Sequence, residues 1–257
     1  MSQSAWWERP DLRYIEGRLF FGNHDLDELA RSAGTPLFAY YGPRIKQSLE
    51  QVHAALNAHA IRHEIFYAMK ANRFLPLMTY LKTLGLCGVD ITSPGELDLA
   101  RQAGFLPNQI SYTGTMVADD DLEVVARNPQ VRFNCDSISV IRRLGQRMPG
   151  REIGIRINPQ IGLGYKQTLL YAGDHSTKFG IYQDRYEEAL ETAARYDLKV
   201  KTLHFHGGSG FLSPALKYLG RILERCEWFL ERTPGVETLN CGGGLGRPQR
   251  PGDEPLD

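Results

Sequence analysis

The segment EIFYAMKAN (residues 64–72) decides the fold, because a short apolar run rich in strand-forming residues ends there on a lysine and an asparagine. Further apolar runs of this kind follow along the chain, each ending in polar or glycine-rich residues. Longer segments of helical period come after most of them, which is the pattern of strand–helix units around a parallel sheet. The predicted strands are EIFYAM (64–69), CGVDIT (87–92), ISYTG (110–114), VRFNCD (131–136), EIGIRIN (152–158), TLHFHGG (202–208) and ETLNCGG (237–243), and the predicted helices span 74–84, 94–103, 119–127, 137–147, 185–196 and 214–232.

Two α/β architectures fit this alternation, an open doubly wound sheet and a TIM (β/α)8-type barrel. Polar residues and glycines lie at or just past the carboxyl ends of the predicted strands, namely Lys70, Asp90, Arg156, His206 and the glycines at 242–244. A barrel brings such ends together on one face, whereas an open sheet spreads them along a line. We therefore predict the barrel, with one site at its mouth.

The N-terminal residues 11–41 differ from this pattern. They contain two extended pieces, RYIEGRLFFG (13–22) and TPLFAYYG (35–42), around a short predicted helix over 26–33. Extended apolar pieces need a partner to satisfy their backbone groups. The chain offers no obvious one, so we expect these pieces to pair with something else.

Charge and cysteine content limit the possible partners. The 257 residues carry 30 Lys+Arg and 30 Asp+Glu, so no net charge favours nucleic acid or an anionic membrane. The four cysteines are far apart and form no metal-ligand spacing with histidines, which favours free thiols in a reducing compartment and no metal site. The N-terminus lacks the features of a signal peptide, and no apolar run is long enough for a membrane span. We expect a cytoplasmic protein with a small-molecule partner.

Two helix starts carry their own signals. Ser93-Pro94-Gly95-Glu96 combines a Ser N-cap, a Pro at the first helical position and a Glu at the third, which predicts a capping box. The acidic residues at 119–121 place negative charge where the helix dipole favours it.

Lys70 follows an apolar strand and is the first candidate for chemistry. At the mouth of a barrel we expect its side chain to be partly desolvated, which makes the neutral amine available as a nucleophile toward an aldehyde. A solvated surface charge is the alternative, because lysines at strand ends commonly have that role.

Two glycine-rich segments are candidate phosphate sites. LHFHGGSG (203–210) offers His206, backbone amides and the hydroxyl of Ser209 beyond a strand, and NCGGGLG (240–246) offers three consecutive glycines. Tight turns and a core histidine at 204 are the alternatives. A dinucleotide-binding fingerprint is disfavoured, because no G-x-G-x-x-G opens a helix after the first strand.

Six segments in this order, FYAMKAN, VDITSPGEL, GIRINP, STKFGI, LHFHGGSG and NCGGGLG, resemble those of the fold type III pyridoxal-phosphate-dependent amino-acid decarboxylases, the diaminopimelate/ornithine decarboxylase family. The resemblance runs from about residue 19 to residue 246, and GIRINP to KFGI is most similar to the diaminopimelate branch. It implies an alanine racemase-like barrel and pyridoxal 5'-phosphate as cofactor.

The resemblance also implies roles for individual residues. Lys70 would hold the cofactor covalently and His206 would stack on its pyridine ring. Arg156 would lie beneath the ring, while Asp90 and Glu96 complete a polar network near Lys70. The phosphate would be held by Ser209, Gly210, Gly242, Gly243 and Gly244. For Glu96, the capping box is an equally good explanation.

The sequence departs from the family at its C-terminal end. The family continues through an eighth barrel strand and a β-domain, neither of which is found here, so we expect a C-terminally truncated chain with an incomplete barrel. The expected division is an N-terminal segment 1–41 belonging to the family's β-domain, a cofactor-binding barrel over 42–247, and a polar tail over 248–257. In the family the N-terminal pieces pair with the β-domain. The resemblance implies a homodimer in the complete family protein, or here a partner chain that supplies the missing C-terminal half.

The resemblance implies the decarboxylation of an amino acid, most like that of meso-diaminopimelate to L-lysine and CO2. Ornithine, lysine, arginine and a carrier-bound amino acid remain open as substrates. A non-catalytic pyridoxal-phosphate-binding barrel and a pseudoenzyme that regulates a relative are alternative functions. Alanine racemase chemistry ranks lower, because its tyrosine base comes from a region that this chain lacks.

Overall fold

The computed structural model describes residues 7–163 and 177–256 and divides the chain into two compact units. The smaller unit comprises Met1–Glu64 with Gln249–Gly252, and the larger comprises Ile65–Pro248 with Asp253–Asp257. The segment 42–58, which the sequence assigned to the barrel, is grouped with the smaller unit. That the first 41 residues belong to a β-domain remains a proposal.

The smaller unit contains a three-stranded antiparallel sheet, β1 (Leu12–Ile15), β2 (Arg18–Phe21) and β3 (His24–Asp25). Its first two strands form a hairpin around Glu16 and Gly17, both of which have positive φ, as a tight two-residue turn requires. The piece RYIEGRLFFG therefore pairs with itself. The expectation that it lacks a partner within the chain was wrong, because the Glu-Gly turn was not recognised.

Two helices complete the smaller unit. Helix α1 (Leu26–Ala33) has the predicted bounds, and Asp25 caps it by accepting a hydrogen bond from the amide of Asp27 at 2.8 Å. Helix α2 (Gly42–Ala58) was not predicted, although Pro43 stands in its first turn. The piece TPLFAYYG forms no strand over its described residues 35–41.

The larger unit is built on a seven-stranded sheet with the strand order β10-β9-β8-β7-β6-β5-β4. All neighbouring pairs are parallel, and each predicted strand is found. β4 and β10 stand at the two ends of the order, so the sheet is an incomplete barrel, as predicted. The strands are β4 (Phe66–Ala68), β5 (Gly88–Ile91), β6 (Ile110–Thr113), β7 (Arg132–Cys135), β8 (Glu152–Arg156), β9 (Lys199–His204) and β10 (Thr238–Asn240).

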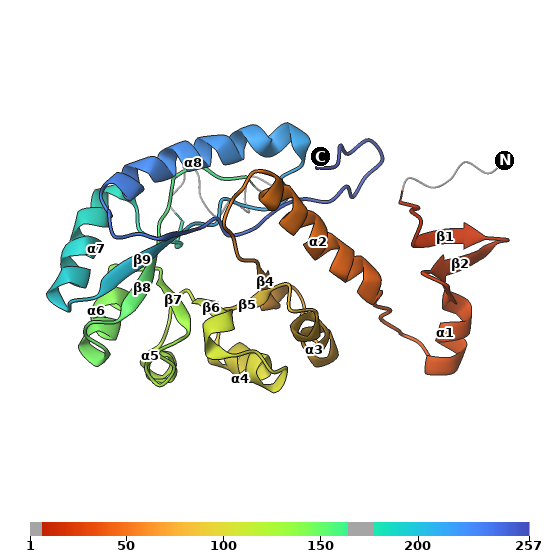
Figure 1. Ribbon diagram of the computed structural model, residues 1–257, viewed down its shortest axis with the longest axis horizontal. Coiled ribbons are helices and arrows are strands. Elements are labelled where there is room, and N and C mark those ends of the chain that lie inside the picture. The colour runs from red at the N-terminus through yellow and green to blue at the C-terminus, as the bar shows by residue number, and fades with distance from the viewer. Residues whose placement is uncertain (1–6, 164–176, 257) are drawn as a thin grey trace. The chain divides into compact units, whose positions relative to one another are not determined.

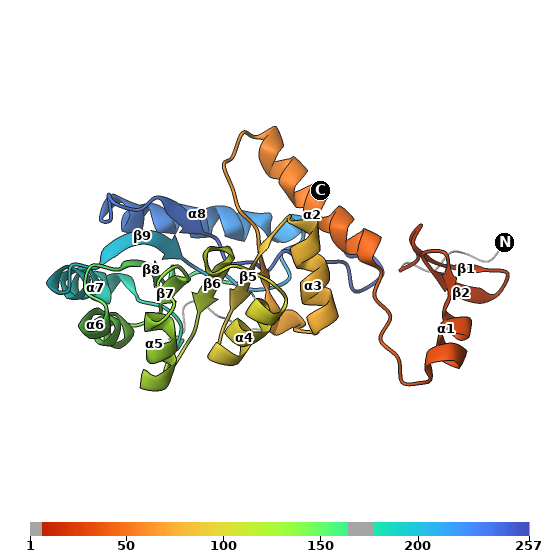
Figure 2. The ribbon, with the colours of Figure 1, turned by 60° about the horizontal axis from the view of Figure 1, so that its bottom comes forward.

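Six helices lie in an arc around the outside of this curved sheet (Figures 1 and 2). All six were predicted, with ends within a few residues of those observed. They are α3 (Leu75–Leu84), α4 (Pro94–Gln102), α5 (Asp119–Ala126), α6 (Ile138–Arg147), α7 (Gln183–Arg195) and α8 (Leu216–Glu231).

The two faces of the sheet differ in chemistry because side chains alternate along each strand. Toward the helices the strands bury apolar side chains, among them Val89, Ile110, Phe133, Ile155 and Leu203. Residues at the intervening positions share the other, concave face, and register aligns them from strand to strand: Ala68 with Asp90, Asp90 with Ser111, Thr113 with Asn134, Asn134 with Gly154, and Arg156 with His204. The concave face is therefore polar.

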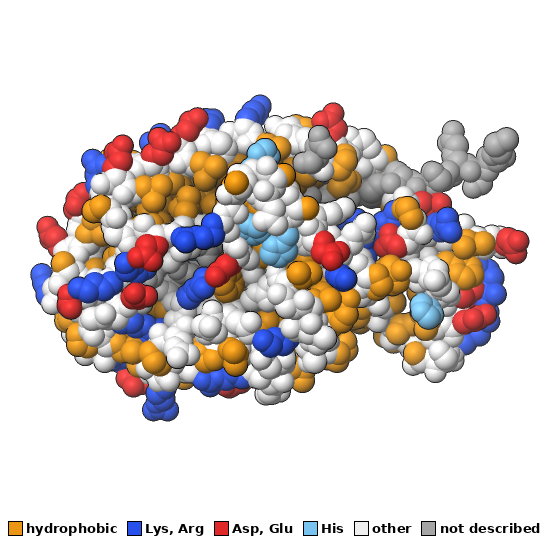
Figure 3. Space-filling model, in the orientation of Figure 1, with side chains coloured by type: hydrophobic (Ala, Val, Ile, Leu, Met, Phe, Trp, Pro, Cys, Tyr) orange, Lys and Arg blue, Asp and Glu red, His pale blue; other side chains and the backbone are white. Residues whose placement is uncertain are grey.

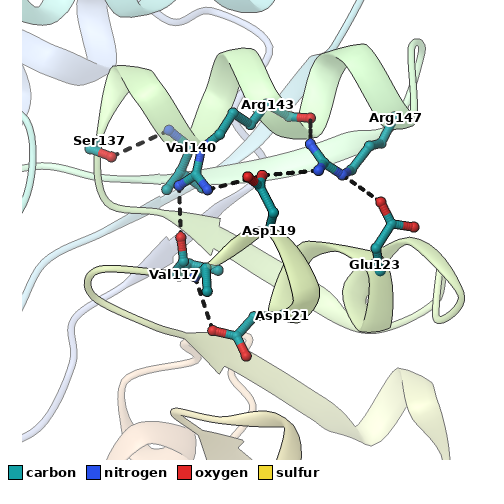
Figure 4. Close-up of polar contacts among 9 residues, drawn as sticks. Val117, Asp119, Asp121, Glu123, Ser137, Val140, Arg143 and Arg147 are labelled. Atoms are coloured by element: carbon teal, nitrogen blue, oxygen red, sulfur yellow. Dashed lines mark hydrogen bonds and ion pairs between the residues drawn. The ribbon is translucent and has the colours of Figure 1, made fainter.

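Arginines of α6 hold the N-terminal end of α5 (Figure 4). Arg143 donates through Nη2 to the carbonyl oxygen of Val117 at 2.7 Å, and Arg147 donates to Asp119 Oδ1 at 2.9 Å and to Glu123 Oε1 at 2.8 Å. Ser137 caps α6 through the amide of Val140. No helix among the described residues is long and apolar enough to cross a membrane.

Candidate functional site

Lys70 lies in a short 3-10 turn, Met69–Ala71, directly after β4. Met69 fills the core beneath this turn, with no exposed surface, and thereby fixes the start of the turn. The Lys70 side chain is exposed, so the partial desolvation expected from the sequence is not found in this structure. Its charge nevertheless acts on Asp90, His204 and His206.

Asp90 stands beside β4, opposite Ala68 in the register. Its Oδ1 accepts hydrogen bonds from Ser111 Oγ at 2.7 Å and from Thr113 Oγ1 at 3.4 Å. Burial raises the pKa of this carboxyl to about 6, against the lowering effects of the Ser111 hydrogen bond and the Lys70 charge. The group therefore titrates near neutral pH.

Glu96 is 2% exposed and holds the turn after β5. Its Oε2 accepts hydrogen bonds from Thr92 N at 2.8 Å and Thr92 Oγ1 at 3.0 Å, and Arg73 Nη1 lies 3.5 Å from Oε1. Ser93 caps α4 through the amide of Glu96, as predicted. The reciprocal bond of the capping box goes to the amide of Thr92 rather than that of Ser93, so only half of the predicted box forms.

Arg156 is buried at the end of β8, opposite His204. Its guanidinium carbon lies 4.6 Å from the centre of the Phe179 ring, and Nη1 donates to Thr115 Oγ1 at 3.3 Å. Burial lowers the pKa of Arg156, and the charge of Asp136 opposes that shift. Phe179 belongs to the segment STKFGI, whose first residue, Ser176, lies outside the described residues.

Two histidines lie at the end of the next strand: His204 is the last residue of β9, and His206 comes two residues later. His204 is buried, and its Nδ1 has no hydrogen-bond partner in the part of the chain that the structure describes. His206 is only partly buried and accepts at Nδ1 from the amide of Gly243 at 3.4 Å. Burial, together with the charges of Lys70 and Arg156, lowers the pKa of His206 to about 4. The ring is therefore neutral at pH 7.

The loops after β9 and β10 pack directly against each other. Phe211 N donates to Gly244 O at 2.9 Å, and Gly246 N donates to Phe211 O at 2.7 Å. Gly244 has φ +103°, and a Cβ there would lie 2.0 Å from the oxygen of Gly208, so only glycine allows this approach. In contrast, a Cβ at Gly243 would meet nothing within 4 Å. An open space thus borders the exposed Gly243 beside His206.

Ser209 and Gly210 lie in the first of these loops. The amide of Ser209 donates to the carbonyl oxygen of Leu163 at 3.0 Å, and Gly210 has positive φ. Gly242 also has positive φ, and its amide donates to Asn240 Oδ1 at 2.9 Å. These contacts shape the loops, and the phosphate contacts assigned to Ser209, Gly210 and the glycines at 242–244 remain proposals.

Curvature brings the two ends of the sheet toward one site. Lys70 follows β4, at one end of the sheet, and His206 follows β9, next to the other end, yet the Lys70 charge lowers the pKa of His206. Asp90 and Arg156 likewise interact through their charges across the concave face. Figure 3 shows histidine side chains near the middle of the visible face, with basic and acidic side chains beside them. The structure therefore brings Lys70, Asp90, Arg156 and His206 into electrostatic reach of one another.

Several polar residues of this face were not predicted. Ser111 and Asn134 lie inside strands and Thr113 is the last residue of β6, and all three are at least 90% buried. Alternation of polar and apolar residues in ISYTG and VRFNCD is the signal that would have found them. Thr115 and Phe179, which contact Arg156, lie in loops and carried no such signal, whereas Asp136, whose charge acts on Arg156, ends the alternating segment VRFNCD.

The fold is that of a known family. Residues 44–257 match the family model described as the pyridoxal-binding domain of pyridoxal-dependent decarboxylases, so the chain belongs to that family. The resemblance stated from the sequence is thereby confirmed, and so is the cofactor, pyridoxal 5'-phosphate. The open space at Gly243, the neutral ring of His206 and the lysine beyond β4 fit that cofactor.

Individual relatives point to one branch of the family. The chain is 37% identical over 257 aligned residues to a diaminopimelate decarboxylase of Methanothermobacter thermautotrophicus. This alignment covers 96% of this chain and 58% of that protein. A solved Aquifex aeolicus protein, AQ1208, is similar with a TM-score of 0.78 and 30% identity, over 95% of this chain and 58% of that one. The structure of diaminopimelate decarboxylase from Helicobacter pylori, complexed with L-lysine, is similar with a TM-score of 0.74 and 25% sequence identity. The match covers 86% of this chain and 57% of that one. The chain thus spans less than three fifths of the length of these relatives.

Proposed function

We propose that this chain is the cofactor-binding part of an amino-acid decarboxylase that converts meso-diaminopimelate to L-lysine and CO2. Its relatives of that name, and the L-lysine bound to the Helicobacter pylori structure, support this substrate. The single observation that carries the proposal is the convergence of Lys70, Asp90, Arg156 and His206 on the concave face.

The residues of this face divide the work of holding the cofactor. Lys70 would hold the cofactor covalently through its aldehyde, and the neutral ring of His206 would contact the pyridine. The glycine loops would hold the phosphate, with Gly243 next to the open space. When bound, pyridoxal phosphate supplies the electron-accepting ring that takes up the electron pair left by CO2.

Charged side chains near Lys70 control proton exchange at its amine. Asp90 titrates near neutral pH and stands beside the strand that carries Lys70, so it can hold or release a proton next to that amine. Arg156 is fixed by Phe179 and Thr115 and keeps a positive charge at the floor of the site. Glu96 is fixed by Thr92, and its catalytic role remains part of this proposal.

We further propose a cytoplasmic location and a homodimer, or a partner chain that supplies the missing half. The four cysteines are all free thiols, which is usual in a reducing compartment. The unpaired ends of the seven-stranded order, β4 and β10, offer backbone groups to another strand.

A release assay with labelled amino acids tests this function. Purified protein with pyridoxal phosphate is given meso-diaminopimelate, ornithine, lysine or arginine, each labelled in its carboxyl groups. We expect labelled CO2 from meso-diaminopimelate alone, with L-lysine formed in equal amount. Lys70→Ala should abolish release, whereas Lys82→Ala, in which the lost lysine contacts Gln109 instead, should not.

Two results would reject the proposal. Release from another amino acid in preference to meso-diaminopimelate would assign a different substrate. Cofactor bound without release from any substrate, in the chain alone and together with a supplied C-terminal half, would favour a cofactor-binding protein without catalysis.

A further inference from the structure

A relay of hydrogen bonds crosses three neighbouring strands on the concave face. Asn134 Nδ2, on β7, lies 2.9 Å from Thr113 Oγ1 and 3.4 Å from Ser111 Oγ, both on β6. These two hydroxyls lie 3.4 Å and 2.7 Å from Oδ1 of Asp90 on β5. The relay therefore connects a buried amide to the carboxylate beside Lys70.

The chemistry of the groups gives the relay a direction. An amide nitrogen only donates hydrogen bonds, so both hydroxyls accept from Asn134. Each hydroxyl then donates its own hydrogen to Oδ1 of Asp90. An oxygen that accepts two such bonds has a lower affinity for a proton. The other carboxylate oxygen, Oδ2, accepts no hydrogen bond from the described residues.

Packing fixes the orientation of the Asn134 amide. The side chain is 2% exposed, and its neighbour on β8 is Gly154. A Cβ at position 154 would lie only 2.0 Å from Asn134 Oδ1. The glycine therefore provides the room that the amide oxygen needs, while the amide nitrogen points toward β6.

We propose that Asn134 is a positioning residue for Asp90, which directs two hydroxyl hydrogens onto Oδ1 and leaves Oδ2 as the oxygen that gains and loses a proton. Its bearing on the reaction rests on the proposed function. The relay itself is a property of the protein without cofactor, so it is tested without activity.

The charged groups that face Asp90 are few and are not part of the relay. Lys70 after β4 and Arg156 on β8 favour the ionised carboxylate, and Glu96 of α4 opposes it. Burial has the largest effect and raises the pKa to about 6, while the two hydroxyl bonds lower it. When Asn134 no longer directs the hydroxyls, the carboxylate loses part of that support and its pKa rises further.

The experiment follows the carboxyl carbon of Asp90 by NMR during a pH titration of the protein with carbon-13-labelled aspartate. Asp90→Asn identifies the signal. We expect Asn134→Leu and Gly154→Ala each to move its midpoint upward by about one pH unit, the effect of weakening a hydrogen bond to a charged group. Gly154→Ala is the sharper variant, because it displaces the amide without changing any polar or charged group.

Asn128→Leu is the matched control. Asn128 is also buried, but its amide contacts Arg101 and the carbonyl oxygen of Val124, away from Asp90. The Asp90 midpoint should stay at its wild-type value in this variant, even if stability falls.

An unchanged midpoint in folded Gly154→Ala or Asn134→Leu would overturn the relay, as would an equal shift in Asn128→Leu. If Asn134→Leu does not fold, Gly154→Ala decides. Failure of cofactor attachment at Lys70 with the Asp90 shift intact would reject the proposed function and leave the relay standing.

Discussion

At the scale of single residues, the site combines two groups whose pKa values are shifted in opposite directions. Burial lowers the pKa of His206 to about 4 and raises that of Asp90 to about 6. Both groups therefore favour their neutral forms in the folded protein. A neutral ring can lie against the cofactor, and a carboxyl that titrates near pH 6 can exchange a proton under working conditions.

These shifts predict opposite effects of pH on stability. His206 accepts a proton more readily in the unfolded chain, so its contribution is complete above pH 6.5 and is lost as pH falls toward 4. Asp90 binds its proton more tightly when folded, so its contribution is complete below pH 3.8 and is lost as pH rises through 6.

Urea unfolding of His206→Asn and Asp90→Asn between pH 4 and 7 measures both contributions. As pH falls, the free energy of unfolding of the wild type should decrease by up to about 3 kcal/mol relative to that of His206→Asn. As pH rises, it should decrease by a similar amount relative to that of Asp90→Asn. Parallel curves for the variants and the wild type would show that the two groups are not perturbed.

Two neighbouring glycines should separate folding from cofactor binding. Gly244→Ala places a Cβ against the oxygen of Gly208 at a positive φ, so we expect a loss of at least about 1 kcal/mol of stability. Gly243→Ala enters open space, so stability should change by less than about 0.5 kcal/mol while the affinity for pyridoxal phosphate falls. Unfolding curves and cofactor titration test the pair, and unimpaired binding by Gly243→Ala would remove this glycine from the phosphate site.

At the scale of elements, the connection between α5 and α6 depends on arginines. Arg143 contacts the carbonyl oxygen of Val117 and the carboxylate of Asp119, and its side chain is 27% exposed. We expect Arg143→Ala to cost about 1 kcal/mol in the free energy of unfolding. Arg142→Ala, on the exposed side of the same helix, should stay within about 0.5 kcal/mol. Equal losses in both variants would show that helix propensity, rather than the contact with α5, sets the effect.

The sequence predicted the elements of the larger unit well, because apolar runs and helix caps are local signals. Strands β4 to β10 and helices α3 to α8 were all expected, and Ser93 caps α4. The hairpin at Glu16 and Gly17 and the helix over 42–58 were missed, the first because its turn was overlooked. The partner predicted for the Glu96 carboxylate was also wrong, because it accepts from the amide of Thr92 instead of that of Ser93.

The candidate site was predictable only in part, because some of its contacts depend on how distant segments pack together. Residues at strand ends, such as Lys70 and Arg156, stand out in a sequence, because a polar residue follows an apolar run. Alternation places Asn134 and the hydroxyls that it contacts on one face, but the contacts among them depend on the register between strands, which no local pattern specifies. The exposure of Lys70 likewise depends on how neighbouring loops cover it.

At the scale of the whole molecule, the open ends of the seven-stranded sheet should be its least protected part. β6 is buried at every residue and lies between neighbours on both sides, whereas β4 and β10 each have one neighbour in the order. Amides of β6 and β7 should therefore exchange most slowly with solvent, and those of β10 fastest among the strands. Hydrogen exchange with peptide-level mass analysis tests this, and equal protection of β10 and β6 would show that β10 is covered in solution.

The most direct test of the account is whether Lys70 holds the cofactor on the concave face. The protein is mixed with pyridoxal phosphate, reduced with borohydride, digested and analysed by peptide mass. The account predicts one labelled peptide, containing Lys70, which disappears in Lys70→Ala and persists in Lys82→Ala. Label scattered over surface lysines and unaffected by Lys70→Ala would contradict it.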